Sequence, residues 1–180
     1  MRVTLTGIII LLLLAFGLCL APPTNSAQQD ESQVKAVFVL NFAKLTEWPG
    51  DGYGDSSAFT IAILGKVPSA IFINTLKSQT VHGTKVTVRH IEAVSDANGV
   101  NLVYISDSER QRLSGILREL SHQNILTVSD ISGFCEAGGM IGLVPVQNRL
   151  GFEVNLTVAR KSRLTLSSQL LKLSKVLYGQ

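Results

Sequence analysis

The segment Leu126–Asn155 limits the folds open to this chain more than any other part of its sequence. The residues from Ile125 to Val128 are apolar and mostly β-branched, which predicts a strand covered on both faces. Ser129 and Asp130 come where that strand would end, and short polar side chains at such a point bond the local backbone and start a turn. The segment therefore begins as a buried strand that ends in an acidic turn.

The second half of this segment has the pattern of a β-hairpin. Gly138-Gly139 permits a positive φ or the close approach of another backbone, and the apolar run Met140–Val144 follows. A strand with one buried face is predicted next by the alternation of Phe152, Val154, Leu156 and Val158 with Glu153, Asn155 and Thr157. The two runs are separated by a few residues around Gln147-Asn148, so we expect an antiparallel hairpin.

Helices and strands alternate through the rest of the chain. Helical spacing of apolar residues predicts a first helix that begins at Asp30 or Ser32 and ends by Trp48, because Pro49 disfavours the helical conformation in the residue before it. A closing amphipathic helix is predicted by Leu166, Leu170, Leu173 and Leu177. Between them we expect strands at 59–64, 86–91 and 101–105 and helices at 68–78 and 106–124.

This order of elements predicts the α/β fold class. Strands that alternate with helices favour a parallel sheet with helices on both faces. The expected hairpin adds an antiparallel strand and makes the sheet mixed. We therefore expect a three-layer α/β sandwich, in which helices flank a mostly parallel mixed sheet, with a C-terminal β-hairpin and a closing helix.

The N-terminus has the three regions of a secretory signal peptide. Arg2 gives a positive start, Ile8–Leu14 an unbroken apolar run, and small and polar residues lead to a cleavage site near Ala27. The apolar run is shorter than the ~20 residues that span a membrane, which favours a cleaved peptide over a retained anchor. Cys19 follows Leu18 where lipoprotein processing requires a small residue, so we place it in the discarded peptide. We expect residues 28–180 to form a single domain.

Four segments follow one another in an order that characterises one protein family. They are Val34–Pro49 (VKAVFVLNFAKLTEWP), Phe59–Gly65 (FTIAILG), Leu126–Asn155 and Leu166–Leu173 (LSSQLLKL). Together they resemble the YfiR-like family of bacterial periplasmic proteins. The resemblance implies the same α/β fold, a location in the periplasm and a homodimer. It also implies a repressor that holds the sensor domain of an inner-membrane diguanylate cyclase inactive, which lowers cyclic di-GMP and biofilm formation.

One cysteine, Cys135, remains once the signal peptide is removed. YfiR-like proteins often carry a second cysteine shortly after this one, and none follows in this chain. A disulfide within the mature chain is therefore excluded, and redox control through a local disulfide lacks its second thiol. We interpret Cys135 as a small buried hydrophobe, with an intermolecular disulfide as the alternative.

The sequence contains no motif for catalysis, phosphate binding or metal binding. It lacks G-x-S-x-G and G-x-x-x-x-G-K, and the glycines around Gly139 lead into a strand, without the helix N-terminus that would hold a pyrophosphate. His82, His90 and His122 have no partner at metal-ligand spacing. The net charge is +3, and scattered lysines and arginines do not support nucleic-acid binding. We predict a protein that is not an enzyme and that holds no cofactor or metal.

Five side chains are the candidates for binding a ligand or a partner: Trp48, Asp130, Glu153, Asn155 and Ser167. Asp130 ends a strand at its carboxyl edge, where open α/β sheets bind ligands. Glu153 and Asn155 lie on the polar face of the last expected strand. Trp48 precedes a glycine-rich loop and suits a small-molecule or peptide pocket that also holds Ser167 or its neighbour Ser168. The alternatives are a turn-forming aspartate, a solvated strand face and a tryptophan of the core.

Two functions of different classes remain open. The first is a regulatory binding protein that represses an inner-membrane sensor by binding its inactive state more tightly than its active state. The second is a periplasmic small-molecule-binding protein or an uncharacterised enzyme on the same scaffold, with Trp48, Asp130 and Glu153 in its pocket. The two combine if a bound metabolite weakens the hold on the partner.

Overall fold

Three strands whose side chains are almost all buried form the middle of a mixed sheet, as the continuous apolar runs predict. The computed structural model describes residues 26–50, 58–147 and 149–179, with side chains from residue 31 onward. Within these ranges the main sheet contains, in spatial order, β10 (Val176–Tyr178), β8 (Arg149–Asn155), β7 (Ile141–Val146), β6 (Leu126–Ser129), β5 (Leu102–Ile105), β2 (Phe59–Leu64), β4 (Thr84–Ile91) and β3 (Thr80–Val81).

The pairing of these strands confirms the expected mixed sheet. From β7 to β4 all neighbouring strands are parallel, and β8 runs antiparallel to β7 as the predicted hairpin. Strand β10 then pairs in parallel with β8 at the edge of the sheet. A separate two-stranded sheet joins β1 (Thr46–Glu47) to β9 (Thr165–Leu166) in antiparallel register.

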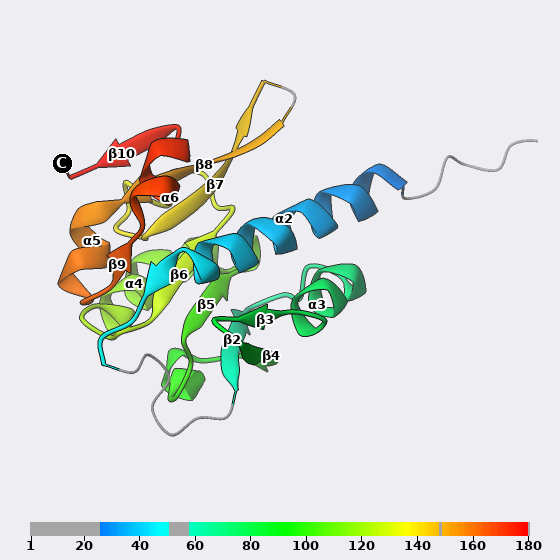
Figure 1. Cartoon of the computed structure of the whole chain (residues 1–180), viewed down its shortest axis with the longest axis horizontal. Helices are drawn as coiled ribbons and strands as arrows, with labels where there is room; N and C mark the ends of the chain where they lie inside the picture. Colours follow the sequence, from blue (N-terminus) through cyan, green and yellow to red (C-terminus); the bar gives the residue numbers. More distant parts are fainter. Residues whose placement is uncertain (1–25, 51–57, 148, 180) are drawn as a thin grey trace, which may run out of the picture.

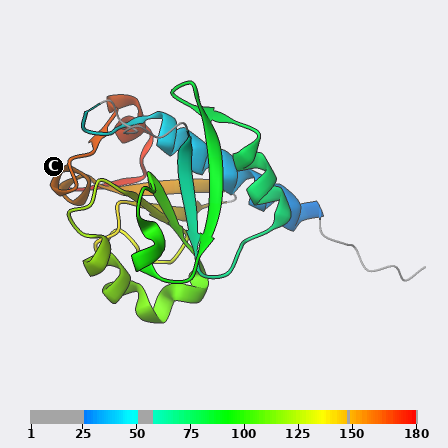
Figure 2. The ribbon, with the colours of Figure 1, turned by 90° about the horizontal axis from the view of Figure 1, so that it is seen from below.

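Helices cover both faces of the sheet and complete the three expected layers (Figures 1 and 2). The helical segments are α2 (Ser26–Lys44), α3 (Ala70–Lys77), η1 (Val94–Ala97), η2 (Asp107–Arg112), α4 (Leu113–Leu120), α5 (Leu156–Lys161) and α6 (Ser168–Leu173). Helices α2 and α3 share a buried apolar cluster with Ile61 and Ile63 of β2. Helix α4 and η1 share a second cluster with Ala62 and Leu64, because alternate residues of a strand point to opposite faces. Within the described residues, every helix is too short or too polar to cross a lipid bilayer.

The first helix begins and ends earlier than the sequence predicts. Helix α2 already includes Ser26 and ends at Lys44, so Trp48 lies beyond the short strand β1 and not at a helix end. The hydroxyl of Thr46 donates to the carbonyl of Phe42 (2.7 Å), which satisfies a backbone acceptor at the helix C-terminus. The predicted cleavage site near Ala27 therefore lies in the first turn of α2, while the rest of the predicted signal peptide, residues 1–25, lies outside the described residues.

The C-terminal part departs from the predicted strand and helix at Asn155. The expected strand through Val158 stops there, because the Asn155 side chain accepts a hydrogen bond from the Val158 N–H (3.1 Å) and caps α5. The expected closing helix between Leu166 and Leu177 is divided into β9, the six-residue α6 and the edge strand β10. Leucines at helical spacing thus mark α6, but the spacing does not show where that helix ends.

Two glycines give a matched test of this packing. A β-carbon on Gly139 would overlap the ring of the buried Phe134, whereas one on Gly115, in α4, would meet no atom within 4 Å. We expect Gly139→Ala to lower the free energy of unfolding by about 1–3 kcal/mol through overpacking. Gly115→Ala is expected to raise it by up to about 1 kcal/mol, because alanine is the better helix former. Urea unfolding of both variants measures this, and equal effects would contradict the predicted contact with Phe134.

Candidate functional site

The helical connections between strands change from one face of the sheet to the other between β2 and β5, and a cleft opens at that point. After β2 the chain crosses to β4 through α3 on one face, and after β5 it crosses to β6 through α4 on the other face. The loops that leave the carboxyl ends of β2 and β5 therefore diverge. In open α/β sheets such a topological switch point is where ligands bind.

The cleft at the switch point has a volume of about 210 Å³ and a mixed polar and apolar lining. We call it the Asp130 cleft. Strands β2, β5 and β6 contribute the residues at or just beyond their carboxyl ends, and the first turns of α2 close the side. The described residues that line it are Glu31, Ser32, Lys35, Lys66, Val67, Pro68, Tyr104, Ser106, Asp107 and Asp130.

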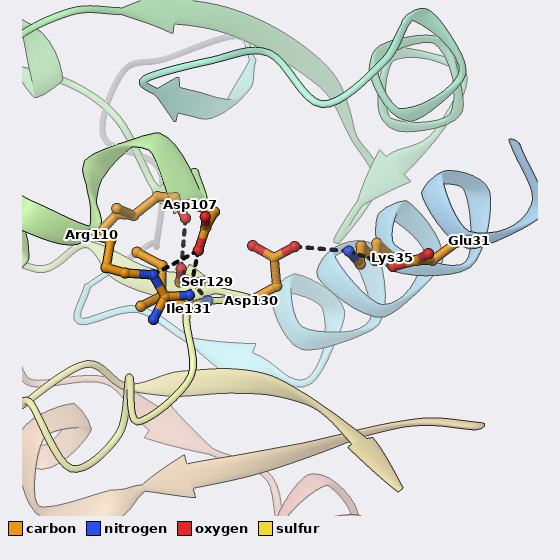
Figure 3. Close-up of polar contacts among 8 residues, drawn as sticks. Glu31, Lys35, Asp107, Arg110, Ser129, Asp130 and Ile131 are labelled. Atoms are coloured by element: carbon orange, nitrogen blue, oxygen red, sulfur yellow. Dashed lines mark hydrogen bonds and ion pairs between the residues drawn. The ribbon is translucent and has the colours of Figure 1, made fainter. Parts of the chain in front are cut away.

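The Asp130 carboxylate points into this cleft and is held by a lysine from α2 (Figure 3). The Lys35 ammonium donates to Asp130 at 2.8 Å and lies 2.7 Å from the Glu31 carboxylate. The side chains of Lys35 and Asp130 are only 19% and 23% exposed, so water screens this pair less than a surface ion pair.

The backbone around Asp130 is fixed by the residue before it. The Ser129 hydroxyl donates to the carbonyl of Ile105 (2.7 Å) and accepts a hydrogen bond from the N–H of Ile131 (3.0 Å). These bonds tie the end of β6 to the end of β5 and form the turn that Ser129 and Asp130 predict. Asp130 is thus presented to the cleft by a strand end that the two Ser129 hydrogen bonds hold in place (Figure 3).

The ionisation of the cleft follows from burial and from these charges. Burial alone would lower the pKa of Lys35, but its hydrogen bonds and charge interactions with Asp130 and Glu31 outweigh burial and raise it. Burial and the Asp130 charge raise the pKa of Tyr104, so its hydroxyl stays protonated. The cleft therefore offers an ammonium and a carboxylate to a small polar ligand, and the buried Tyr104 forms part of its wall.

Lys35 and Tyr104 were missed by the sequence analysis, although one signal could have indicated this wall of the cleft. Ser106 and Asp107 follow the buried strand β5 in the same way as Ser129 and Asp130 follow β6. Parallel strands end at one edge of the sheet, so the two polar pairs belong together. Lys35 gives no such signal, because 95 residues separate it from Asp130.

The other four predicted site residues lie outside the lining of the Asp130 cleft. Trp48 is 8% exposed, belongs to the main apolar cluster and meets Phe59 edge-on with ring centroids 5.3 Å apart. Ser167 caps α6 by accepting the N–H of Leu170 (3.2 Å). The structure therefore does not gather Trp48, Asp130 and Ser167 around one cleft.

Glu153 and Asn155 are near each other on β8 but have different partners. The Tyr178 hydroxyl, from β10, donates to the Glu153 carboxylate at 3.3 Å. The Asn155 amide donates to the carbonyl of Cys135 at 2.9 Å while its oxygen caps α5. Asn155 thus holds the turn before β7 against the start of α5, and a part in binding stays a prediction for both residues.

Comparison with known proteins identifies the family. The model of the YfiR/HmsC-like family matches residues 32–175. The chain belongs to the YfiR/HmsC-like family. This confirms the resemblance seen in the sequence, and the family is known for periplasmic regulation of diguanylate cyclases, with a regulatory and not a catalytic role. The match includes the Asp130 cleft from Ser32 onward and ends at Lys175, before β10.

A solved structure shares the fold. A conserved domain protein from Vibrio cholerae O1 biovar El Tor str. N16961 matches with a TM-score of 0.54 and 10% sequence identity. The match covers 81% of this chain and 60% of that one, and at this identity it shows the fold alone. A search of curated proteins found no match.

The ion pair in the cleft can be measured by a double-mutant cycle. We expect Lys35→Met and Asp130→Asn to couple by about 1 kcal/mol, because both side chains are mostly buried. Lys35 has its pKa raised above the ordinary 10.5, so its contribution is complete below pH 10.5 and is lost as the pH rises further. Urea unfolding of the four proteins at pH 7 and pH 9 is expected to give the same coupling, and a coupling near zero would contradict the pair.

Cys135 is predicted to be unreactive in the folded protein. Its side chain is fully buried, its thiol points to the Met140 carbonyl (3.6 Å), and burial raises its pKa to about 12. The thiol is therefore protonated at pH 8, and only a thiolate attacks a disulfide reagent. We expect labelling by Ellman's reagent to be at least about 100-fold slower in the native than in the urea-unfolded chain. Fast labelling, or a reducible dimer, would favour the intermolecular disulfide.

Proposed function

We propose that this protein is a periplasmic regulator that binds the sensor domain of an inner-membrane diguanylate cyclase and represses the enzyme. The match to the YfiR/HmsC-like family over residues 32–175 is the observation that carries the proposal. Repression lowers cyclic di-GMP and thereby biofilm formation. The regulator is a homodimer of a single domain, residues 28–180, released in the periplasm when a Sec-type signal peptide is cleaved near Ala27.

Repression by binding is a shift between two states of the sensor. The regulator must bind the inactive state more tightly than the active state, and the ratio of the two affinities sets the shift. To turn a sensor from 99% active to 99% inactive requires a ratio of about 10⁴. A folded α/β domain with a rigid sheet suits this role, because it presents a fixed surface and loses little conformational entropy on binding.

The Asp130 cleft supports a second function, the binding of a small molecule. It lies at the switch point of the sheet and holds a partly buried ion pair beside a protonated tyrosine hydroxyl. A ligand that competes for Lys35 or Asp130 would loosen the contact between α2 and β6. The two functions combine if that change weakens the hold on the sensor. An uncharacterised enzyme on the same scaffold remains the further alternative.

Deletion and complementation test the repressor. Deleting the gene is expected to raise cellular cyclic di-GMP about tenfold if nine in ten sensors are held inactive. The full chain is expected to restore the low level, whereas a chain that starts at Gln28 after an initiator Met is expected to stay in the cytoplasm and fail. Mass spectrometry of cyclic di-GMP measures each strain.

In-cell crosslinking identifies the partner in the same strains. Tagged full-length protein is expected to capture an inner-membrane protein with a cytoplasmic cyclase domain, and a secreted protein of unrelated fold with the same tag serves as the control. Unchanged cyclic di-GMP after deletion, together with self-crosslinks only, would contradict repression and leave the small-molecule function.

A further inference from the structure

The C-terminal quarter of the chain has a charge unlike the rest. From residue 137 to residue 180 one acidic residue, Glu153, stands against six basic ones: Arg149, Arg160, Lys161, Arg163, Lys172 and Lys175. The preceding 136 residues contain the other ten of the 16 basic residues and the other 12 of the 13 acidic ones. The net charge of +3 is therefore the sum of a basic C-terminal region and a slightly acidic remainder. A basic region of this kind favours partners with negative charge.

Two of these basic residues border a groove of mixed polar and apolar lining at the edge strands of the sheet. The groove has a volume of about 600 Å³ and lies between the β7–β8 hairpin and the segment that joins α6 to β10. We call it the C-terminal groove. Its lining includes the apolar side chains of Val146, Leu150, Phe152 and Leu173 and the cations of Arg149 and Lys175.

Backbone hydrogen bonds fix where Arg149 and Lys175 stand along this groove. Arg149 pairs with Val146 in the register of the β7–β8 hairpin. The N–H of Lys175 donates to the carbonyl of Phe152 at 2.7 Å, immediately before β10 pairs with β8. The groove floor is kept open at Gly151, where a β-carbon would press against Val146. The folded sheet therefore sets the spacing of the two backbone positions from which these cations extend.

These groups have no partner among the described residues. Neither Arg149 nor Lys175 forms an ion pair with any described acidic residue. Glu153, on the same strand as Arg149, bonds Tyr178, and so does Glu136. Leu173 is 66% exposed between Lys172 and Lys175, whereas the exposed valines are between 37% and 43% exposed. Leu173 lines the same groove as Val146, Leu150 and Phe152, and the cations of Arg149 and Lys175 border it, so apolar and charged groups together form a surface suited to a partner.

We propose that the C-terminal groove binds an acidic and apolar segment of the sensor's periplasmic domain, an inference that rests on the proposed repressor function. Apolar side chains of the segment cover Leu173 and enter the recess above Phe152, and its carboxylates meet Arg149 and Lys175. A flat bilayer surface reaches this recess poorly, because Phe152 at its floor is only 6% exposed. Arg149 and Lys175, which border the recess, are therefore placed to meet carboxylates of a protein chain.

The groove can be tested with a defined probe and a matched control. The probe is a fluorescein-labelled peptide of alternating Glu and Leu, titrated with the purified secreted protein. The double variant Arg149→Glu/Lys175→Glu is expected to weaken binding about tenfold or more, because it replaces two attractions with two repulsions. Lys77→Glu/Lys85→Glu reverses two exposed charges on α3 and β4 and is expected to change binding less than about twofold. Leu173→Ser is expected to weaken binding without any change in charge.

Thermal unfolding, monitored by circular dichroism, checks that each variant is folded. The same titrations with the periplasmic domain of the captured sensor are expected to give the same order of variants. Equal affinity of the sensor for Arg149→Glu/Lys175→Glu and for the unaltered protein would overturn the groove and leave the repressor function intact.

Other occupants have their own outcomes. If the peptide binds as expected, but deletion leaves cyclic di-GMP unchanged and no sensor is captured in cells, the groove remains a site for acidic and apolar segments, while the repressor function and the sensor as occupant of the groove both fail. Binding to phosphatidylglycerol vesicles without binding to the peptide would assign the surface to a membrane and overturn the proposal. A dimer that dissociates in Arg149→Glu/Lys175→Glu but not in the control variant would assign it to a second copy of this chain.

Discussion

The packing of α2 across the sheet is the contact on which the rest of the structure depends. Five of its side chains, Ala36, Val39, Leu40, Phe42 and Ala43, are no more than 3% exposed. Phe42 meets Phe152 of β8 with ring centroids 4.9 Å apart, so the helix joins the parallel part of the sheet to the reversed strand. Each large buried side chain contributes roughly 1.5–3 kcal/mol. The same helix holds Lys35 over the end of β6, and its position therefore determines the shape of the Asp130 cleft.

The sheet could be predicted from the sequence because its central strands are buried on both faces. Runs such as Leu102–Ile105 and Leu126–Ser129 are too short for helices and too apolar for loops, and their order along the chain implies parallel pairing. The C-terminal part could not be predicted as well. Leu156 and Val158 fit both a strand and a helix, and the Asn155 cap that decides between them depends on one hydrogen bond.

The candidate site was predictable only in its strand-borne half. Asp130 is found from its place at a strand end, but Lys35 comes from a helix that tertiary packing alone brings to that edge. The C-terminal groove was not predicted, because the count of charged residues was made over the whole chain. Basic residues look scattered along the whole chain, and their imbalance is visible only when the C-terminal region is counted alone. Strand β8 reverses direction after β7, and this reversal brings Val146, Arg149 and Lys175 toward the end of the sheet at which β6 leads into Asp130.

The small sheet of β1 and β9 has a consequence for the order of folding. It pairs Thr46 with Leu166, so segments 120 residues apart in the sequence meet beside the apolar cluster that holds Trp48. Loop closure over such a separation is slow compared with local helix formation. A chain that emerges N-terminus first, from a ribosome or a translocation channel, can form α2 early but cannot fasten it until its last segments arrive. We therefore expect the C-terminal region, which also carries the basic groove, to dock last.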